Sequence, residues 1–205
     1  MPRPLRERRS PLKADVRRDE LLDRLVEVIV EHGFAEASIE ELARALRCSK
    51  STLYVIADSK EQIIAAAVRR FFRRAAAHVD DELQRSAGEP VAQRIRTYLT
   101  AIAADLAPAT PAFFADIDSL ASTREIYRQN TRVAAERVQA LVREASPEGP
   151  STQATFVGAV AAQVMEGIHR GEIETATGLD DSAAFRALAD LIVRGLGPTP
   201  VEGDT

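Results

Sequence analysis

The sequence predicts an all-α protein of about nine helices, in which an N-terminal three-helix domain is joined by a long helix to a larger helical domain. Three observations predict this class: apolar residues recur at helical spacing, hydroxyl residues stand where helices should begin, and no segment reads as a strand. The chain has 205 residues, of which 45% are hydrophobic and 28% charged. These proportions are typical of a globular protein and exclude a disordered one.

The first predicted helix spans residues 15–32. Its apolar residues, spaced by three and four, are Leu21, Leu22, Leu25, Val28 and Ile29. Gly33 follows them where a helix commonly ends on glycine. Residues 1–14 are rich in Pro and Arg, and two interpretations of them stay open: a solvated flexible tail, or a basic arm that contacts a nucleic-acid backbone.

Residues 38–61 read as two short helices joined by a tight turn. Ser38 and Glu41 have the spacing of a capping box at the start of the first helix. The apolar face of that helix consists of Ile39, Leu42, Ala43 and Leu46. A second helix starts at Ser49, where Leu53 can pack back while Lys50, Ser51 and Tyr54 point away. Small side chains at a helix start allow close approach to a phosphate or a base edge, so this is a helix-turn-helix pattern.

The rest of the chain predicts a longer helical region. Ser59 and Gln62 again have capping-box spacing, and they open a helix over 59–84. Further helices are expected at 90–106, 111–118, 122–146, 151–172 and 181–196, separated by Pro- and Gly-containing breaks. We therefore expect domains at 15–58 and 59–196, with a disordered tail at 197–205.

Charge is unevenly distributed along the chain. Residues 1–74 carry 16 Lys and Arg against 12 Asp and Glu, whereas residues 75–205 carry 11 against 19. A basic front and an acidic back indicate that only the front meets a polyanion.

Four stretches at fixed spacing carry a family resemblance: Leu22 to Phe34, residues 38–43, residues 49–54 and residues 59–61. Together they resemble the N-terminal domain of the tetracycline-repressor (TetR) family over about a quarter of the chain. The resemblance implies a sequence-specific DNA-binding transcriptional regulator, a repressor that a small molecule releases from its double-stranded operator. It also implies a homodimer and a C-terminal domain that binds the ligand and dimerises.

The sequence departs from the family pattern at three places. Arg47 stands where the family usually has Gly, and a retained positive φ there costs about 1 kcal/mol. Ile56-Ala57 replaces an aromatic pair or a His-Phe pair. Cys48, the single cysteine, replaces a common Val; a small buried hydrophobe is favoured over a redox switch for it, and its lack of a partner fits a reducing cytoplasm.

The resemblance assigns DNA contacts to eight residues. These are Ser38, Arg44, Ser49, Lys50, Ser51, Thr52, Tyr54 and Lys60. The resemblance implies that Lys50, Ser51 and Tyr54 face the bases or the flanking backbone; Lys50 can donate to guanine, and Ser51 is short enough to allow it. Ser38, Thr52 and Lys60 most resemble phosphate binders, and Arg44 could reach either. The alternative for Lys50 and Arg44 is that they are solvated surface charges.

A ligand pocket is expected in the second domain. Its candidate lining is Tyr98, Ile102, Phe113, Phe114, Ile117, Tyr127, Phe156, Met165 and His169. Core packing is the alternative role for each of them. Polar residues near this set are few, so the expected effector is mostly apolar.

The dimer interface is expected on the last two predicted helices. The candidate residues are Gly158, Ala162, Phe185, Leu188 and Ile192, supported by the small residues Ala159, Ala161 and Gly167 and the apolar Leu191 and Leu196. The alternative is that these faces pack within one protomer.

Other classes of protein find less support. No apolar run is long enough for a membrane span, and no secretory signal is present, so a cytoplasmic protein is expected. We expect no cofactor, no metal and no catalysis, because His32, His78 and His169 lie on separate segments and no phosphate-binding loop or nucleophile motif occurs. Two alternatives stay open: an all-helical enzyme with a helix-turn-helix-like front domain, and a helical protein-interaction module.

Overall fold

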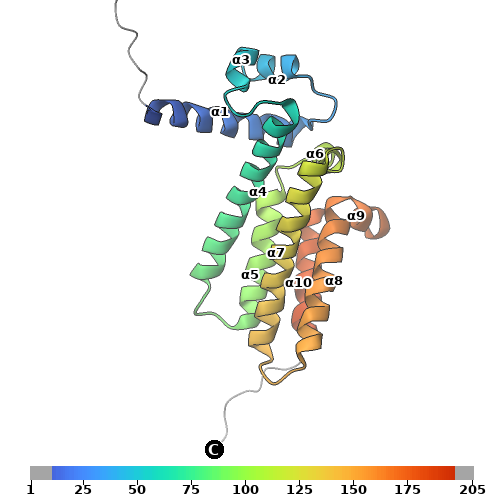
Figure 1. Cartoon of the computed structure of the whole chain (residues 1–205). Coiled ribbons are helices and arrows are strands. Elements are labelled where there is room, and N and C mark those ends of the chain that lie inside the picture. The colour runs from blue at the N-terminus through green and yellow to red at the C-terminus, as the bar shows by residue number, and fades with distance from the viewer. Residues whose placement is uncertain (1–10, 197–205) are drawn as a thin grey trace, which may run out of the picture.

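A computed structural model describes residues 11–196, which form ten α-helices and no strand. The helices are α1 (Pro11–His32), α2 (Ile39–Ala45), α3 (Lys50–Leu53), α4 (Lys60–Arg85), α5 (Val91–Leu106), α6 (Pro111–Ile117), α7 (Ala121–Ala145), α8 (Ser151–His169), α9 (Glu172–Thr177) and α10 (Asp181–Gly195). In Figure 1, α1 to α3 lie across one end of a bundle made by α4, α5, α7, α8 and α10. The predicted all-α fold, a helix-turn-helix domain followed by a helical domain, is confirmed.

The first helix is longer than expected. α1 begins at Pro11, inside the segment 1–14 for which we expect a basic arm. The remainder of that segment, and the tail expected at 197–205, lie outside the described residues.

Serine side chains cap the N-termini of α2, α3 and α4, at the positions where the sequence predicts helix starts. Ser38 accepts from the Glu41 N–H, and the Glu41 carboxylate accepts from the Ser38 N–H at 2.7 Å, which completes the predicted capping box. Ser59 likewise accepts from the Gln62 N–H at 3.2 Å. Gln62 Oε1, however, accepts from the N–H of Asp58 rather than Ser59. The expected hydrogen bond from the Ser59 N–H to the Gln62 side chain is therefore replaced by one from the N–H of the preceding residue.

One apolar core runs through both parts of the molecule. The α1 face made by Leu21, Leu25 and Ile29 is buried, and Leu53 and Ile63 are fully buried in the same cluster. The polar side of the α1–α4 contact is a bidentate ion pair. Arg70 donates from Nε and Nη2 to the two Asp23 carboxylate oxygens at 2.9 and 2.8 Å. The long helix α4 is thus fixed against the N-terminal domain by both packing and charge.

A tenth helix comes from the segment expected as one helix over 151–172. α8 ends at His169, and Gly171 takes a left-handed backbone with φ 70° before α9 begins. Residues with a Cβ pay about 1 kcal/mol or more in that conformation, so glycine suits the break. A single glycine in the sequence does not indicate a left-handed backbone, so the sequence did not predict a separate α9.

α6 joins the two parts of the protein at the end of α1. Asp116 Oδ2 accepts from the backbone N–H of Phe34 and from that of Ala35, the latter at 2.8 Å. Just before α6, the backbone and the hydroxyl of Thr110 both donate to the Val30 carbonyl at 3.1 Å. Gly33 allows the close approach, because a Cβ there would lie 2.6 Å from Asp116 Oδ2.

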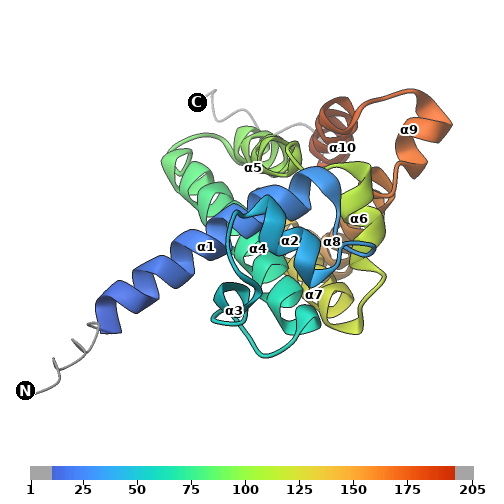
Figure 2. The same ribbon diagram turned by 90° about the horizontal axis from the view of Figure 1, so that it is seen from above.

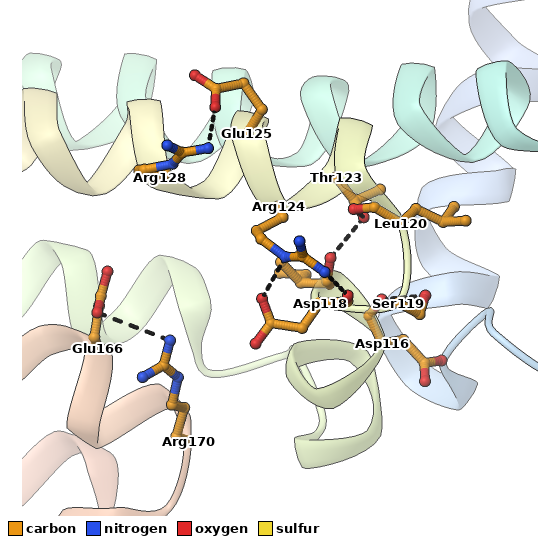
Figure 3. Close-up of polar contacts among 11 residues, drawn as sticks. Asp116, Asp118, Ser119, Leu120, Thr123, Arg124, Glu125, Arg128, Glu166 and Arg170 are labelled. Atoms are coloured by element: carbon orange, nitrogen blue, oxygen red, sulfur yellow. Dashed lines mark hydrogen bonds and ion pairs between the residues drawn. The ribbon is translucent and has the colours of Figure 1, made fainter.

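The other end of α6 is tied to the bundle. Figure 3 shows Thr123 and Arg124 of α7 reaching back to the α6–α7 turn while Asp116 points toward the loop after α1. The Thr123 hydroxyl donates to the Ile117 carbonyl at 2.7 Å, and Arg124 pairs with Asp118 at 3.3 Å. α6 therefore contacts both the helix-turn-helix domain and the bundle.

None of the helices in residues 11–196 is long and apolar enough to cross a membrane.

Candidate functional site

The turn between α2 and α3 is braced from α1. Arg47 has φ 51°, and among residues 11–196 it is the one non-glycine residue with a positive φ. The next N–H, of Cys48, donates to the Ala43 carbonyl at 2.9 Å, and Arg24 of α1 donates to the Leu46 carbonyl. The Cys48 side chain is half-buried against the core, and burial raises the pKa of its thiol. The turn thus keeps its geometry although the Arg47 backbone is strained.

α3 is a single helical turn that shows polar side chains to solvent. Its backbone hydrogen bonding continues past Leu53, because the Ile56 N–H donates to the Leu53 carbonyl at 2.9 Å. Leu53 and Ile56 are buried against the core. The exposed residues of this unit are Ser49, Lys50, Ser51, Thr52, Tyr54 and Val55. Figure 1 shows α2 and α3 beyond α1, on the side away from the bundle, and in Figure 2, which looks down on this end, they lie in front of the bundle.

Sequence reasoning missed Val55, whose side chain is 57% exposed beside Tyr54. A signal was available. Leu53 and Ile56 lie three residues apart and share the buried face, which leaves Val55 on the outer one. An exposed apolar side chain beside polar ones can contact a thymine methyl group.

The hydroxyl groups of α3 form a cluster at its first turn. Ser49 Oγ lies 2.8 Å from Ser51 Oγ and 2.7 Å from Thr52 Oγ1, and it accepts from the Thr52 N–H at 3.1 Å. Such hydroxyls can contact phosphate or sugar oxygens without adding bulk. Ser38 is different, because its hydroxyl already donates to the Glu41 carboxylate at 2.7 Å within the cap.

The three predicted cations of this region lie at its surface or edge. Lys50 pairs with Glu40 of α2, an interaction that holds the pKa of the Glu40 carboxyl below its usual value. Lys60 donates to the Ala35 carbonyl at 3.1 Å, and Arg44 is exposed near the end of α2. All three can turn toward an anion, but Lys50 must first exchange its carboxylate partner.

A cavity of about 90 Å³ lies inside the bundle between α4, α5, α7 and α8. Five of the residues predicted for the pocket line it: Tyr98, Ile102, Tyr127, Met165 and His169. Its lining also includes four polar residues that the sequence did not single out, namely Asp80, Asn130, Thr131 and Arg137. The cavity is therefore more polar than expected.

The other four residues predicted for the pocket lie elsewhere. Phe113 and Ile117 are buried in the core, and Phe114 stacks on the His169 ring with 4.6 Å between centroids. Phe156 does not line the cavity. It is 68% exposed on the outer face of α8, because Ala154 and Gly158 are the residues that α8 turns inward there.

His169 is the one buried ionisable group of the cavity wall with an unsatisfied nitrogen, among the residues that the structure describes. Its side chain is held by Tyr127, whose hydroxyl lies 2.7 Å from His169 Nδ1. Burial lowers the pKa of His169 to about 4, so the ring is neutral near pH 7. Nε2 is buried and has no hydrogen-bond partner in the described part of the chain.

The helix-turn-helix geometry can now be compared with known proteins. Residues 21–67, from α1 into the first turns of α4, match the family described as "Bacterial regulatory proteins, tetR family". The N-terminal domain of this chain is a TetR-family domain. No curated protein matches the sequence.

Solved structures extend the TetR likeness to the whole fold. A TetR-like transcriptional regulator from Rhodococcus sp. RHA1 is 21% identical, with a TM-score of 0.62 over 89% of this chain and 97% of that one. Another regulator from the same organism is 17% identical, with a TM-score of 0.67 over 87% and 96%. The TetR-family regulator PfmR from Thermus thermophilus is 22% identical, with a TM-score of 0.58 over 88% and 97%. At these identities the likeness establishes the TetR fold.

Within this TetR fold, most residues predicted for a dimer interface pack inside the protomer. Phe185, Leu188 and Ile192 of α10 are buried in the core, and Gly158 faces α7. A Cβ at Gly158 would lie 3.1 Å from the Ala135 carbonyl oxygen, so this glycine permits close α7–α8 packing. Ala162 is half-buried. The alternative of packing within one protomer therefore holds for these side chains.

α8 and α10 each nevertheless expose one large apolar side chain. Phe156 is 68% exposed and Leu191 is 64% exposed. Figure 1 shows the start of α8 and the end of α10 at the same end of the bundle. Among residues 11–196, no group of three or more His, Cys, Asp or Glu side chains could hold a metal ion.

Proposed function

We propose that this protein is a dimeric, sequence-specific DNA-binding transcriptional regulator, a repressor that a small, mostly apolar molecule releases from its operator. The observation that carries the proposal is the polar outer face of α3 over the buried Leu53 and Ile56, inside the segment that matches the TetR family. A helix-turn-helix lays its second helix in the major groove while the first crosses the backbone.

The roles proposed on DNA follow from the chemistry of each side chain. Lys50 can donate to guanine O6 and N7 once it leaves Glu40, and Tyr54 with Val55 can contact bases or sugars beside it. The hydroxyl cluster of Ser49, Ser51 and Thr52 would bind phosphate oxygens, with Lys60 and Arg44 supplying positive charge. Ser38 would act at the DNA by fixing the start of α2, because its hydroxyl and its N–H are both used in the cap.

A dimer is proposed because one turn of recognition helix contacts too few base pairs to select an operator. Two copies related by a twofold axis read half-sites about 34–36 Å apart. The exposed apolar side chains Phe156 and Leu191 make the outer face of α8 and α10 the proposed contact between copies. Exposed large apolar groups gathered on one face of a monomer mark such surfaces.

Release by an effector would act through the contacts that tie the two parts together. A ligand in the cavity between α4, α5, α7 and α8 lies against the helix that enters the DNA-binding domain. It shifts DNA affinity only by binding one arrangement of that helix more tightly than the other.

DNA binding is tested by a mobility shift on the DNA that flanks the protein's own coding region. Replacing Lys50 and Tyr54 together by Ala should weaken the specific complex by about 100-fold or more, since each base contact contributes about 1–3 kcal/mol. The matched control is Arg132→Ala, which removes an exposed cation from α7. Full affinity in the double variant would overturn the assignment of α3 as the reading helix.

A phosphate role for Lys60 has a different signature. The Lys60→Ala variant should bind all sequences more weakly and reduce the slope of log affinity against log salt by about 1, with unchanged base preference. An unchanged slope would remove Lys60 from the set of phosphate contacts.

The proposed dimer face is tested by sedimentation. Phe156→Asp with Leu191→Asp should give monomers at micromolar protein, because two carboxylates would be buried without partners. Val55→Asp, an equally exposed apolar site on the DNA-binding unit, should leave the dimer intact. A wild-type protein that sediments as a monomer would contradict the proposal.

A further inference from the structure

The cavity wall contains a hydrogen-bonding atom that nothing in the described chain satisfies. His169 is 8% exposed, its Nδ1 is engaged by Tyr127, and Nε2 is buried without a partner. An unmade hydrogen bond at a buried polar atom costs about 1–3 kcal/mol, so such atoms generally have a partner in the working protein. His169 is one of the cavity-lining residues, so a molecule that enlarges the cavity as it binds can reach this nitrogen and supply the partner.

The contact with Tyr127 decides whether Nε2 donates or accepts. A phenol O–H is a stronger acid than the N–H of a neutral imidazole. The unprotonated ring nitrogen of the imidazole is, in turn, a stronger base than the phenol oxygen. Tyr127 therefore donates its O–H to Nδ1 across the 2.7 Å contact. Burial raises the pKa of Tyr127, so the phenol keeps its proton near pH 7 and can donate it to the ring nitrogen.

In a neutral imidazole the one remaining proton then lies on Nε2. We propose that the effector is a small neutral molecule with an apolar body and one acceptor oxygen, such as a ketone or an ester, that takes a hydrogen bond from His169 Nε2–H. This inference rests on the proposed function, because it assigns chemistry to the effector cavity. It adds to the proposed effector one acceptor group, placed opposite His169 Nε2.

The charges around the cavity favour a neutral molecule over a carboxylate. The one cation among the described lining residues is Arg137, and it donates to Asp80 at 3.0 Å. The ring of His169 is neutral and is packed by Phe114 and Phe185. A carboxylate would enter without an unpaired cation to offset the loss of its hydration, which is costly in a buried site.

The small size of the cavity implies that ligand binding changes the arrangement of the surrounding helices. At about 90 Å³ it is smaller than the roughly 300–1,000 Å³ of typical ligand pockets. A larger molecule must move the surrounding helices apart, so it binds an expanded arrangement in preference to this one. Such a difference in affinity between two arrangements is what a regulating ligand requires.

The proton position is tested by nitrogen NMR on the full-length protein with labelled histidine. His169→Gln identifies the resonances of His169. We expect the proton on Nε2 and a bare Nδ1 at pH 7. A proton on Nδ1 would overturn the proposal, since Nε2 would then be an acceptor and the effector a donor.

The ligand class is tested with cyclohexanone and methylenecyclohexane, which differ in one C=O against one C=CH₂. Binding is followed by NMR titration and by thermal stabilisation. The ratio of the affinity for cyclohexanone to that for methylenecyclohexane should be roughly 5- to 100-fold higher in the wild type than in His169→Leu, the range expected from one buried unpaired donor. Comparing the two proteins cancels the cost of removing the ketone oxygen from water. His169→Gln, which keeps a donor, should retain part of that increase.

Three outcomes would overturn the inference. A ratio of the two affinities that is the same in the wild type and in His169→Leu would exclude the hydrogen bond, and tighter binding of cyclohexanecarboxylate would replace the neutral class with an anionic one. If no probe binds, the cavity takes no ligand of this chemistry. None of these results bears on DNA binding, which the mobility shift measures on protein without a probe, so failure of the inference and failure of the proposed function are distinguishable.

Discussion

The α2–α3 unit and the bundle cavity both gather polar side chains, but they do so in opposite ways. In α2 and α3 the polar contacts are local and exposed: Ser49 meets Ser51 and Thr52, and Lys50 meets Glu40 ten residues away. At the cavity, Tyr127 meets His169 across 42 residues in the buried core, and Asp80 meets Arg137 across 57 at the half-exposed rim. The first site is built by neighbours in sequence and the second by neighbouring helices.

Because of this difference, the two regions should respond differently to a change of charge or of hydrogen-bond partner. An exposed local site can exchange its partners for DNA at little cost, because water screens its charges. The interior site is sensitive to any change in charge or packing, because buried groups cannot be rescued by solvent. Changes at the buried group should therefore have larger effects than changes at the exposed one.

Acid should destabilise the protein through His169. Burial lowers the pKa of this imidazole from 6.5 in the unfolded chain to about 4 in the fold. The stabilising contribution is therefore complete above pH 6.5 and is lost as the pH falls from 6.5 toward 4, where only the unfolded chain takes up the proton. Over that window we expect a loss of about 3 kcal/mol.

The measurement is urea unfolding of wild type and His169→Gln at about pH 7 and about pH 4, which span the window of the histidine. Subtracting the variant from the wild type cancels the contributions of other titrating groups. The wild type should lose more stability than the variant. An identical pH dependence of the two proteins would show that His169 is not held neutral by the fold.

The same contrast explains how far sequence reasoning went. The caps at Ser38, Ser49 and Ser59 were predictable because each depends on two residues within three positions of each other. The outward direction of Lys50 and Tyr54 followed from the spacing around Leu53 in the same way. Even here a local detail failed, since Gln62 reaches Asp58 and not Ser59.

The cavity and the α8–α10 faces depend on which helices become neighbours, which spacing does not reveal. Phe156 was predicted as a pocket residue, and it is exposed because α8 turns Gly158 toward Ala135 of α7. Leu188 and Ile192 were predicted for the dimer contact, and they are buried within the protomer. The positions of apolar residues indicated that each helix had a buried face but not which partner would cover it.

Removing the α6 side chain that accepts hydrogen bonds from the loop after α1 should have the next largest effect on stability. Asp116→Ala leaves the N–H groups of Phe34 and Ala35 without their acceptor, and hydrogen bonds to a charged group contribute about 1.5–3 kcal/mol. Thermal unfolding should show a destabilisation in that range. Where an effector is known, its ability to release DNA should fall, because α6 would no longer hold the end of α1.

The matched control is Asp118→Ala, two residues further along. Asp118 pairs with Arg124 on the exposed side of the turn, so its loss should cost below about 1 kcal/mol. Equal effects at the two aspartates would argue that Asp116 does no more than an exposed surface charge.

The smallest predicted effect lies in the α2–α3 turn and has the opposite sign. Arg47→Gly removes a Cβ from a residue with φ 51°, so the variant should be more stable by about 0.5–1 kcal/mol, after the added flexibility of glycine in the unfolded chain. Arg44→Gly makes the same chemical change inside α2, where it should destabilise by about 0.5–1 kcal/mol. Differential scanning calorimetry without DNA separates the two. If both variants lose stability alike, the strain at Arg47 is absent, and the local geometry of the DNA-binding unit is more adaptable than its backbone suggests.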